Sequence, residues 1–431
     1  MLHDSYSVNS AGHFCLGGAD THELAQKYGT PLYLLDENNI RACCRTYVNA
    51  VKKHFGPGSA PLYASKANSF KQIYRIANEE GMCTDVVSAG ELYTALSAGF
   101  PAEKIYFHGS AKTDEDISYG VDSGVGTFIV DNLEEMQRLD AYAGKKGVKQ
   151  KILLRITPGI DPHTYEAVNT GKVDSKFGSP LETGQAMELT GVALGFKNLD
   201  LQGFHCHIGS QVFDPDPFTD AADIMIEFIA SVRDTYGFTA KVFDMGGGFG
   251  VRYTEDDPVL DIDACIGSIA KHLKEQCEKH DVPVPAILFE PGRSIVAAAG
   301  VTLYTVQSVK KIRGYKNYAA IDGGMTDNPR YALYGSQYTV CLANRADEKA
   351  DFKCDVVGRC CESGDIIKPD AVLPEPKLGD TVAVMVTGAY NYSMSSNYNS
   401  VPRPPIVMIK DGEDYVAVRR ETYEDMTACQ I

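Results

Sequence analysis

The sequence contains no run of about 18 apolar residues, which excludes a helix that spans a bilayer. Its first residues, Met1-Leu2-His3-Asp4, lack the basic, apolar and small-residue segments of a secretory signal peptide. Lysine and arginine do not gather into a basic run, and the formal net charge is −16. We therefore expect a cytoplasmic protein that binds neither nucleic acid nor membrane, although it could have local cationic pockets for phosphate or carboxylate.

Twelve cysteines are present, but no C-x-x-C motif occurs among them. The two adjacent pairs, Cys43-Cys44 and Cys360-Cys361, have unsuitable spacing for zinc. We expect most cysteines to be small buried side chains in a reducing compartment, and we expect no metal site. Cys361 is the exception, because Glu362 and Asp365 place carboxylates close to its thiol.

A chain of 431 residues is too long for one ordinary domain. From about residue 36 to residue 293, β-rich runs alternate with segments whose apolar residues recur at three- and four-residue intervals, such as 89–98, 133–144, 218–236 and 262–280. Eight strands are expected at 61–65, 83–87, 104–107, 126–130, 151–156, 201–205, 241–245 and 286–289. Eight such units predict a closed parallel (β/α)8 barrel of the TIM type, with a doubly wound open sheet as the alternative.

After residue 296 short β-rich pieces follow one another, separated by Gly, Pro, Asp and Asn turns. They cover 302–310, 318–321, 351–357, 381–386, 406–410 and 415–419, and they predict an all-β sandwich or barrel. The first 35 residues have no helical period, and their runs at 14–16 and 31–35 could be strands of the same β domain. We thus expect N-terminal strands over 1–35, an inserted barrel over 36–296 and a C-terminal β domain over 297–431.

Polar residues fall at or just after the C-terminal ends of the eight expected strands. They are Lys66, Asp85, His108, Asp131, Arg155, His205 with His207, the glycines 246–248, and Glu290. In a (β/α)8 barrel these strand ends converge on one mouth, which is where the chemistry of such barrels takes place. The pattern therefore predicts a functional site at this rim.

Lys66 stands out because it has no neighbouring positive charge and follows an apolar strand. A partly buried amine loses some of its preference for the charged state and can form an imine with an aldehyde cofactor. A structural or solvated lysine is the alternative for this residue taken alone.

Two glycine-containing motifs suggest anion binding. Gly246-Gly247-Gly248 would let backbone N–H groups approach a phosphate, but the dinucleotide fingerprint fails because Val251 occupies its last glycine position. Glu290-Pro291-Gly292-Arg293 offers a carboxylate for a protonated pyridine nitrogen and a guanidinium for carboxylate or phosphate. A plain turn and a surface ion pair are the respective alternatives.

His205 and His207 lie on the same face of a strand, because side chains alternate along it. One imidazole could stack on a planar cofactor while Ser210 binds its phosphate; two satisfied core histidines are the alternative. A metal site would need further ligands, and none is evident nearby in the sequence. Cys361 could donate a proton if it reached a reacting carbon, or it could be an inert thiol.

In this order, from about residue 30 to residue 399, the motifs resemble the fold-type III decarboxylases that use pyridoxal 5′-phosphate, and among them the members that act on diaminopimelate. The most specific segment is Pro158-Gly159-Ile160-Asp161-Pro162-His163-Thr164, continued by Thr170-Gly171 and Asp174-Ser175-Lys176-Phe177-Gly178. The stretches Cys361-Glu362-Ser363-Gly364-Asp365 and Ser393-Met394-Ser395-Ser396-Asn397-Tyr398-Asn399 point the same way. Arg359-Cys360 and Tyr331 depart from the usual pattern of the family.

The resemblance implies roles for individual residues toward the cofactor. Lys66 would carry it covalently, His207 would stack against its ring and Glu290 would bond its ring nitrogen. Asp85 and Arg155 would be supporting polar residues. The phosphate would be held by Ser210, Gly247, Gly248 and Tyr390, with help from the backbone of Gly292 and Arg293.

The resemblance also implies the reaction, which is decarboxylation of meso-2,6-diaminopimelate to L-lysine, the last step of lysine biosynthesis. The distal end of the substrate would contact Arg293, Arg330, Tyr334 and Tyr390, and its amino group would contact Glu362. Cys361 would protonate the carbon that carbon dioxide leaves. In this family Cys361 and Glu362 reach into the partner subunit's site, so a homodimer with shared active sites is implied.

Two alternatives to this reaction remain at the level of the sequence. One is a related decarboxylase that acts on ornithine, arginine or carboxynorspermidine. The other is a catalytically inactive binding protein on the same fold. The pairing of Arg293 with Arg330 favours a dicarboxylic substrate, and the presence of Lys66, Glu290 and Cys361 argues against an inactive protein.

Overall fold

The computed structural model describes residues 2–160 and 175–431. The chain divides into two compact units. The barrel unit comprises Cys44–Gly250 and Val259–Gly292, and the β unit comprises Met1–Cys43, Val251–Pro258 and Arg293–Ile431. These divisions lie close to the boundaries expected after residues 35 and 296, but the short piece Val251–Pro258 was expected in the barrel.

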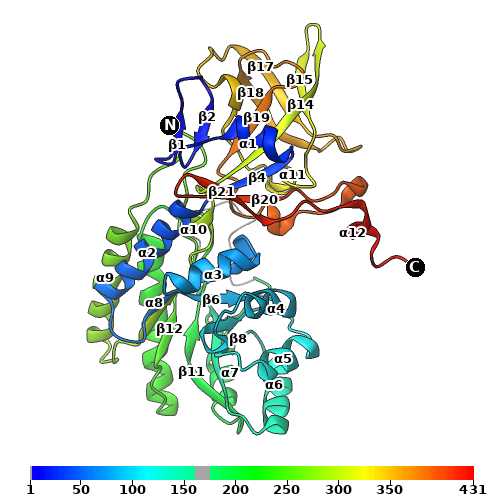
Figure 1. The fold of residues 1–431 in the computed structure, drawn as a ribbon. Coiled ribbons are helices and arrows are strands. Elements are labelled where there is room, and N and C mark those ends of the chain that lie inside the picture. Colours follow the sequence, from blue (N-terminus) through cyan, green and yellow to red (C-terminus); the bar gives the residue numbers. More distant parts are fainter. Residues whose placement is uncertain (1, 161–174) are drawn as a thin grey trace. The chain divides into compact units, whose positions relative to one another are not determined.

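Eight parallel strands form the barrel unit (Figure 1). They are β5 (Ala60–Ala64), β6 (Cys83–Val86), β7 (Ile105–Phe107), β8 (Thr127–Val130), β9 (Gln150–Thr157), β11 (Leu199–His205), β12 (Val242–Asp244) and β13 (Ala286–Phe289). Each pairs with the next, and β13 pairs with β5, so the sheet closes. The closed barrel is confirmed, and the doubly wound open sheet is excluded.

The barrel interior is filled by apolar side chains from four of these strands. Leu62, Ile129, Leu153 and Leu288 pack together with at most 1% of their surface exposed. Strands buried on both faces read as nearly continuous apolar runs, which explains why all eight could be located in the sequence. The short strand β10 (Ser179–Pro180) pairs with β9 outside the closed ring.

Helices flank the barrel strands (Figure 1). They are α3 (Lys71–Glu79), α4 (Ala89–Ser97), α5 (Asp114–Asp122), α6 (Leu133–Lys146), α7 (Gln185–Ala193), α8 (Asp216–Tyr236) and α9 (Ile262–Lys279), while α2 (Glu37–His54) crosses the division between the units. Several begin at a side chain that satisfies a free backbone N–H: Ser88, Thr113, Asn132 and Asp261 each accept one such bond.

The β unit contains a long sheet with the order β18-β17-β15-β14-β4-β20-β21. Its N-terminal strand β4 (Leu32–Asp36) pairs antiparallel with β14 (Gly300–Ile312) and parallel with β20 (Ile406–Lys410). The remaining strands are β15 (Lys316–Ile321), β16 (Val340–Leu342), β17 (Phe352–Val357), β18 (Ile366–Leu373), β19 (Thr381–Met385) and β21 (Glu413–Val418), and β1 (Tyr6–Val8), β2 (Phe14–Leu16) and β3 (Ala19–Asp20) form a small sheet. The expected insertion of the barrel between parts of one β domain is confirmed.

One expectation about the N-terminus is wrong. Residues Thr21–Tyr28 form the helix α1, although no helical period was recognised there. The Asp20 side chain caps this helix by accepting bonds from the backbone of His22 and Glu23, and Leu24 and Ala25 supply its buried side. The helix has three buried positions, Thr21, Leu24 and Ala25, and only two of them are apolar, which is too few to produce a clear hydrophobic period.

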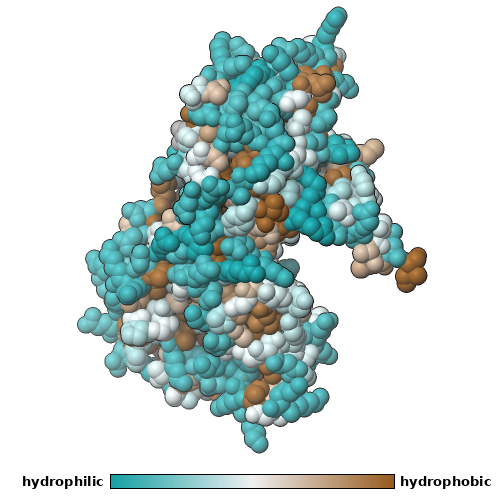
Figure 2. Space-filling view, in the orientation of Figure 1, coloured by the Kyte–Doolittle hydropathy of each residue, from teal (hydrophilic) through white to brown (hydrophobic). Residues whose placement is uncertain are grey.

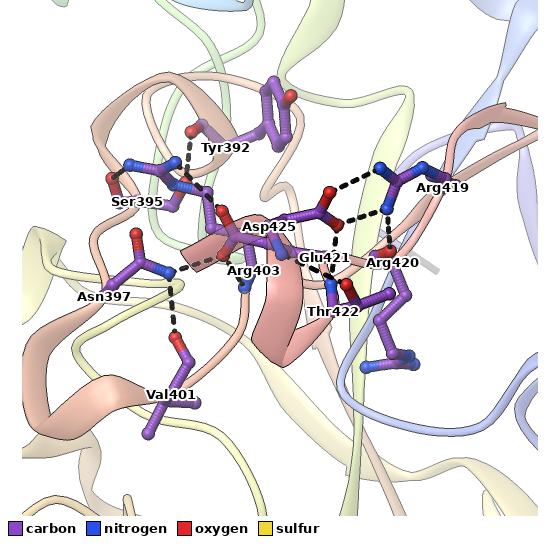
Figure 3. Close-up of polar contacts among 10 residues, drawn as sticks. All are labelled: Tyr392, Ser395, Asn397, Val401, Arg403, Arg419, Arg420, Glu421, Thr422 and Asp425. Atoms are coloured by element: carbon purple, nitrogen blue, oxygen red, sulfur yellow. Dashed lines mark hydrogen bonds and ion pairs between the residues drawn. The ribbon is translucent and has the colours of Figure 1, made fainter. Parts of the chain in front are cut away.

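The C-terminal segment is bound to a loop of the same unit (Figure 3). Glu421 Oε2 accepts hydrogen bonds from Asn397 Nδ2 at 2.5 Å and from the backbone N–H of Arg403 at 2.9 Å. Asp425 pairs with Arg419 and closes a capping box with Thr422 at the start of α12 (Tyr423–Thr427). These bonds hold the tail against the motif 393–399.

Apolar groups are scattered over the face seen in Figure 2, which is mostly hydrophilic. No helix within residues 2–160 and 175–431 is both long enough and apolar enough to cross a membrane.

Candidate active site

Lys66 lies in the 3₁₀ turn η1 (Ser65–Ala67), directly after β5. Its side chain is exposed, so the expectation of a partly buried amine is wrong. The reason is local, because the turn buries Ser65 and Ala67 on either side and leaves Lys66 as the residue between them that reaches solvent. Its positive charge nevertheless acts on the rim, since it opposes the rise in the pKa of Asp85 that burial and Glu290 cause.

Two acidic side chains hold the turn that carries the lysine. Asp85 Oδ1, from the end of β6, accepts a hydrogen bond from the Ser65 backbone N–H at 3.1 Å. Glu91, in α4, accepts one from Ser65 Oγ at 2.9 Å and one from the Val87 backbone at 2.8 Å. Sequence reasoning assigned Asp85 a supporting role but missed Glu91, which carries no motif of its own.

Glu290 lies at the C-terminal end of β13 and is 7% exposed. His108, which follows β7, places its Nε2 2.5 Å from Glu290 Oε1, and His205, at the end of β11, places its Nε2 3.4 Å from Oε2. Burial alone would raise the pKa of Glu290, but the two histidines lower it well below its usual range. Glu290 is therefore held as a carboxylate.

The neighbouring carboxyl groups behave in the opposite way. Asp244, at the end of β12, is fully buried, and its Oδ1 accepts a hydrogen bond from the Gly246 backbone at 2.9 Å. Burial and the negative charge of Glu290 raise the pKa of Asp244 well above its usual range, and the same two causes act on Asp85. Opposite shifts within one cluster assign the negative charge to Glu290.

Four of these side chains form a compact cluster at the rim. Donor atoms of His108, His205, Asp244 and Glu290 all lie within 4.8 Å of one another, and a group of this kind could hold a metal ion. The sequence revealed no further ligands near His205, because the fold brings them from β7, β12 and β13. The absence of a metal site remains a prediction.

The glycines after β12 form a cradle with the loop that follows β11. Val212, beyond Ser210, pairs with Phe249, and the Val212 N–H donates to the Gly248 carbonyl at 2.9 Å. A Cβ on Gly247 would lie 2.1 Å from the Glu290 carbonyl oxygen, and one on Gly248, which has φ +114°, would lie 2.3 Å from the Gly209 carbonyl oxygen. Only glycine fits at these positions, which leaves backbone groups bare for an anion.

His207 lies between this cradle and the acidic cluster. Its Nδ1 accepts a hydrogen bond from the Gly247 N–H at 3.2 Å, which fixes the proton on Nε2. Burial and the positive charge of Lys66 lower the pKa of His207 well below its usual range, so the ring is neutral. The positive charge of Arg155, at the end of β9, also lowers the pKa of His207 and of His205. The guanidinium of Arg155 lies 4.5 Å from the ring centroid of Phe177.

A second group of predicted residues lies in the β unit around Tyr390. The guanidinium of Arg293 lies 4.7 Å from the Tyr390 ring centroid, and that of Arg330 lies 5.2 Å from it. Arg293 Nη1 also donates to Tyr253 Oη at 2.8 Å, and Arg330 lies 4.4 Å from the ring of Tyr334. Two guanidinium groups held on one ring form a planar cationic surface suited to a carboxylate. Tyr253 was not predicted.

Cys361 and Glu362 are exposed in the loop between β17 and β18. Asp365 fixes this loop by accepting hydrogen bonds from the backbone of Cys360 at 2.7 Å and of Met325 at 2.6 Å. The Cys361 N–H donates to Asn399 Oδ1 at 2.8 Å. The roles of Cys361 and Glu362 remain predictions.

The segment that is most specific in the sequence is described in part. Residues Asp161-Pro162-His163-Thr164, Thr170-Gly171 and Asp174 lie outside the described residues. At its end, the Gly178 N–H donates to Asp131 Oδ1 at 3.0 Å, and Thr157 Oγ1 donates to the Phe177 carbonyl at 2.6 Å. These bonds attach residues 177–178 to the ends of β8 and β9.

Comparison with known proteins identifies the family of this chain. The family described as pyridoxal-dependent decarboxylase, pyridoxal binding domain, matches residues 39–297. The chain is 45% identical to the diaminopimelate decarboxylase of Bacillus subtilis (strain 168), over all of this chain and 98% of that one. It is 44% identical to the diaminopimelate decarboxylase of Bacillus methanolicus, over 97% of each chain.

A solved structure agrees with these relatives. The crystal structure of the diaminopimelate decarboxylase of M. jannaschii in complex with L-lysine superposes with a TM-score of 0.90 at 32% identity, covering 99% of this chain and 98% of that one. The chain belongs to the diaminopimelate decarboxylase family of pyridoxal-dependent decarboxylases.

The residues present fit pyridoxal 5′-phosphate, the cofactor of this family. The bare glycine backbone suits a phosphate, the ionised Glu290 suits a protonated pyridine nitrogen, and the neutral His207 ring offers a flat face. Lys66 supplies a primary amine at the same rim.

Proposed function

We propose that this protein decarboxylates meso-2,6-diaminopimelate to L-lysine and carbon dioxide, the last step of lysine biosynthesis. The observation that carries the choice of substrate is the pair of guanidiniums, Arg293 and Arg330, on the ring of Tyr390. A substrate with an amino acid at each end has a second carboxylate that such a pair can bind in a fork geometry. Ornithine and arginine lack that second carboxylate.

Bound pyridoxal phosphate supplies an aldehyde that a lysine can hold and a ring that accepts the electron pair left by the departing carboxylate. In the proposed mechanism Lys66 holds the cofactor, and the turn fixed by Asp85 and Glu91 orients that amine. Glu290 keeps a proton on the ring nitrogen because its own carboxylate is ionised. The backbone at Gly247 and Gly248, with Ser210, binds the phosphate.

Residues of the β unit have two further proposed roles. Arg293, Arg330, Tyr334 and Tyr390 bind the end of the substrate that does not react, and Glu362 binds its distal amino group. Cys361 delivers a proton to the carbon from which carbon dioxide has left. A thiol in the loop that Asp365 holds is suited to this because it is exposed and its backbone is fixed.

A homodimer with shared active sites accounts for the exposure of this loop. The side chains of Leu333, Tyr334 and Tyr398 are also 57%, 41% and 44% exposed, which is costly unless a partner covers them. We also place the protein in the cytoplasm, since all twelve cysteines are free thiols, as in a reducing compartment.

A substrate panel tests the reaction. Purified protein is mixed with meso-diaminopimelate, ornithine, arginine and carboxynorspermidine in turn, and carbon dioxide and the amine product are measured. An absorbance spectrum of the resting protein reports its cofactor content in the same experiment. We expect lysine from meso-diaminopimelate alone; cofactor-loaded, folded protein that yields none would contradict the proposal.

A complementation experiment tests the shared site. Lys66→Ala and Cys361→Ala variants are each inactive or slow, and mixed dimers would rebuild one complete site from two different chains. Dissociation and reassociation of an equal mixture should restore about a quarter of the wild-type activity. If the two variants carry different affinity tags and the doubly tagged dimers purified in two steps show no recovery, a site that uses residues of both subunits would be excluded.

A further inference from the structure

We propose that His108 and His205 are positioning residues for Glu290: His108 donates a hydrogen bond to one carboxylate oxygen, and the His205 ring packs against His108 and beside the other oxygen, so that the carboxylate has one orientation. The proposal deepens the function proposed above, and it rests on that function for its consequence in catalysis. Both histidines lie at strand ends of the rim, but the family resemblance assigned neither of them a role.

The contacts divide between the two oxygens. His108 Nε2 lies 2.5 Å from Oε1, and His205 Nε2 lies 3.4 Å from Oε2. An ionised carboxylate can only accept hydrogen bonds, so His108 Nε2 must be the donor. Oε2 is approached by a ring that, among residues 2–160 and 175–431, has no hydrogen-bond partner at either nitrogen. The two rings also meet edge to face, with centroids 4.9 Å apart, which restricts both.

Glu290 and His108 are both anchored through their own backbone N–H groups. The Glu290 N–H donates to the Gly246 carbonyl at 2.8 Å, and the His108 N–H donates to the Val86 carbonyl at 2.8 Å. The loop after His108 is fixed by the buried Lys112, whose Nζ donates to the Gly109 carbonyl at 2.9 Å and to Glu135 at 2.7 Å. A histidine on a loop held in this way can set the position of a side chain 182 positions away.

Charged groups from the surrounding strands leave this arrangement with a single negative charge. The charged or titratable groups that interact with Glu290 are Asp85 from β6, Asp244 from β12 and Arg155 from β9, while the charge of Lys66, after β5, acts on Asp85 and His108. Burial lowers the pKa of both His108 and His205, so both rings are neutral at neutral pH, and His108 is the N–H donor to Glu290. A neutral donor orients a carboxylate without cancelling its charge, and the carboxylate still has lone pairs for a ring nitrogen.

The first experiment needs neither cofactor nor turnover. Ring-¹⁵N-histidine spectra of cofactor-free protein report which nitrogen of each imidazole carries the proton, and the His108→Gln and His205→Asn spectra assign the two signals by their loss. At pH 7 we expect neutral rings, with the proton of His108 on Nε2. A proton on Nδ1 of His108, or a doubly protonated ring at either position, would overturn the proposal.

The second experiment measures the cofactor affinity of the apoprotein by absorbance. His108→Phe keeps the ring shape but loses the donor, and we expect pyridoxal phosphate to bind at least about tenfold more weakly, since hydrogen bonds to charged groups are worth this much. His108→Gln keeps an N–H donor and should restore affinity to within about threefold of the wild type. Equal affinities for the wild type and His108→Phe, or no rescue in a folded His108→Gln protein, would overturn the proposal.

A matched control is available on the outside of the barrel. His272 Nε2 and Asp223 Oδ1 form a histidine–carboxylate pair of similar length, 2.6 Å, between α9 and α8. His272→Phe should leave cofactor affinity unchanged, and a loss equal to that of His108→Phe would overturn the proposal. The proposal would also be overturned if the purified wild type contained one equivalent of zinc and the His108→Phe variant contained none, because the cluster would then be a metal site.

These outcomes are separate from the proposed function. A wild-type protein that binds pyridoxal phosphate but yields no lysine would contradict the decarboxylase reaction and leave the spectra and affinities to decide the positioning role. Spectra and affinities that contradict the positioning role of the two histidines would not contradict the proposed production of lysine.

Discussion

The rim of the barrel and the Cys361 loop of the β unit carry chemistry in different ways. At the rim, His108, Glu290 and Asp244 are buried; His108 and Glu290 are bonded to each other from strands that are not adjacent, and Asp244 accepts a bond from the Gly246 backbone. In the loop, Cys361 and Glu362 are exposed, and the described contacts fix their backbone more than their side chains. The comparison teaches that the fold fixes the side chains of the rim by itself, whereas in the loop it fixes mainly the backbone and leaves the side chains of Cys361 and Glu362 exposed.

The largest effect should come from removing the amine at the rim. Lys66→Ala should lower turnover by at least about a thousandfold, because the variant lacks the amine proposed to attach the cofactor covalently. Steady-state lysine release measures it, and Lys71→Ala, an exposed lysine at the start of α3, is the control. Near-normal turnover in Lys66→Ala would show that the amine at the rim takes no part in the reaction, and it would contradict the assignment of the chemistry to the rim.

The next effect sharpens the contrast with the exposed loop. Cys361→Ala should slow turnover by about a hundredfold or more, which is the range for losing a proton donor, while cofactor absorbance is unchanged. Cys429→Ala, which removes the other exposed thiol, should have no effect. An unchanged rate and product in Cys361→Ala would make the loop a structural element.

A smaller effect is expected in the guanidinium pair of the β unit. Arg330→Lys keeps the charge but loses the planar fork, so we expect the KM for diaminopimelate to rise about tenfold or more with little change in the affinity for pyridoxal phosphate. Arg313→Lys, on an exposed turn, is the matched control. Equal KM values in Arg330→Lys and Arg313→Lys would show that the guanidinium pair does not bind the substrate.

The smallest effect is a dependence of stability on pH that the buried rim should have and the exposed loop should lack. Burial lowers the pKa of His205 to about 4, so between that value and the ordinary 6.5 the unfolded chain binds a proton that the folded chain does not. Stability is therefore lost as pH falls, by about 2 kcal/mol from this residue between pH 7.5 and pH 5. Asp85 and Asp244 act in the opposite direction, since their raised pKa values favour protons on the folded chain.

The contribution of His205 to the pH dependence of stability is measured as the difference between the wild type and the His205→Asn variant. Urea unfolding of cofactor-free wild type and His205→Asn at the two pH values should give a shallower pH dependence for the variant. Parallel curves for wild type and His205→Asn would mean that the histidine is not kept neutral by burial.

The sequence predicts much of the barrel and less of what completes its rim. Strands buried on both faces leave apolar runs, so all eight were located, and the ends of those strands gave Lys66, Asp85 and Glu290. The pairing of Glu290 with His108 and His205 could not be predicted, because the residues are far apart in the chain and only closure of the barrel brings them together. The exposure of Lys66 was missed because it depends on how one short turn buries the residues beside it.

The same limit applies to the β unit. Strands β16 and β18 were not predicted, since β16 has three residues and β18 contains a proline and charged residues. The pairing of Arg293 and Arg330 around Tyr390 depends on loops rather than on periodic elements. Positions set by loop conformation leave no period in a sequence.

The place of β4 between β14 and β20 has a consequence for synthesis of the chain. Residues 32–36 leave the ribosome early, but their partner on one side begins about 370 residues later. At ordinary elongation rates that strand waits roughly 20 to 70 seconds with unsatisfied backbone groups, while the barrel between its partners can already fold. A nascent chain arrested before residue 300 should therefore be cut by protease near its N-terminus and resist cutting in the barrel; protection of residues 32–36 in that chain would contradict this order.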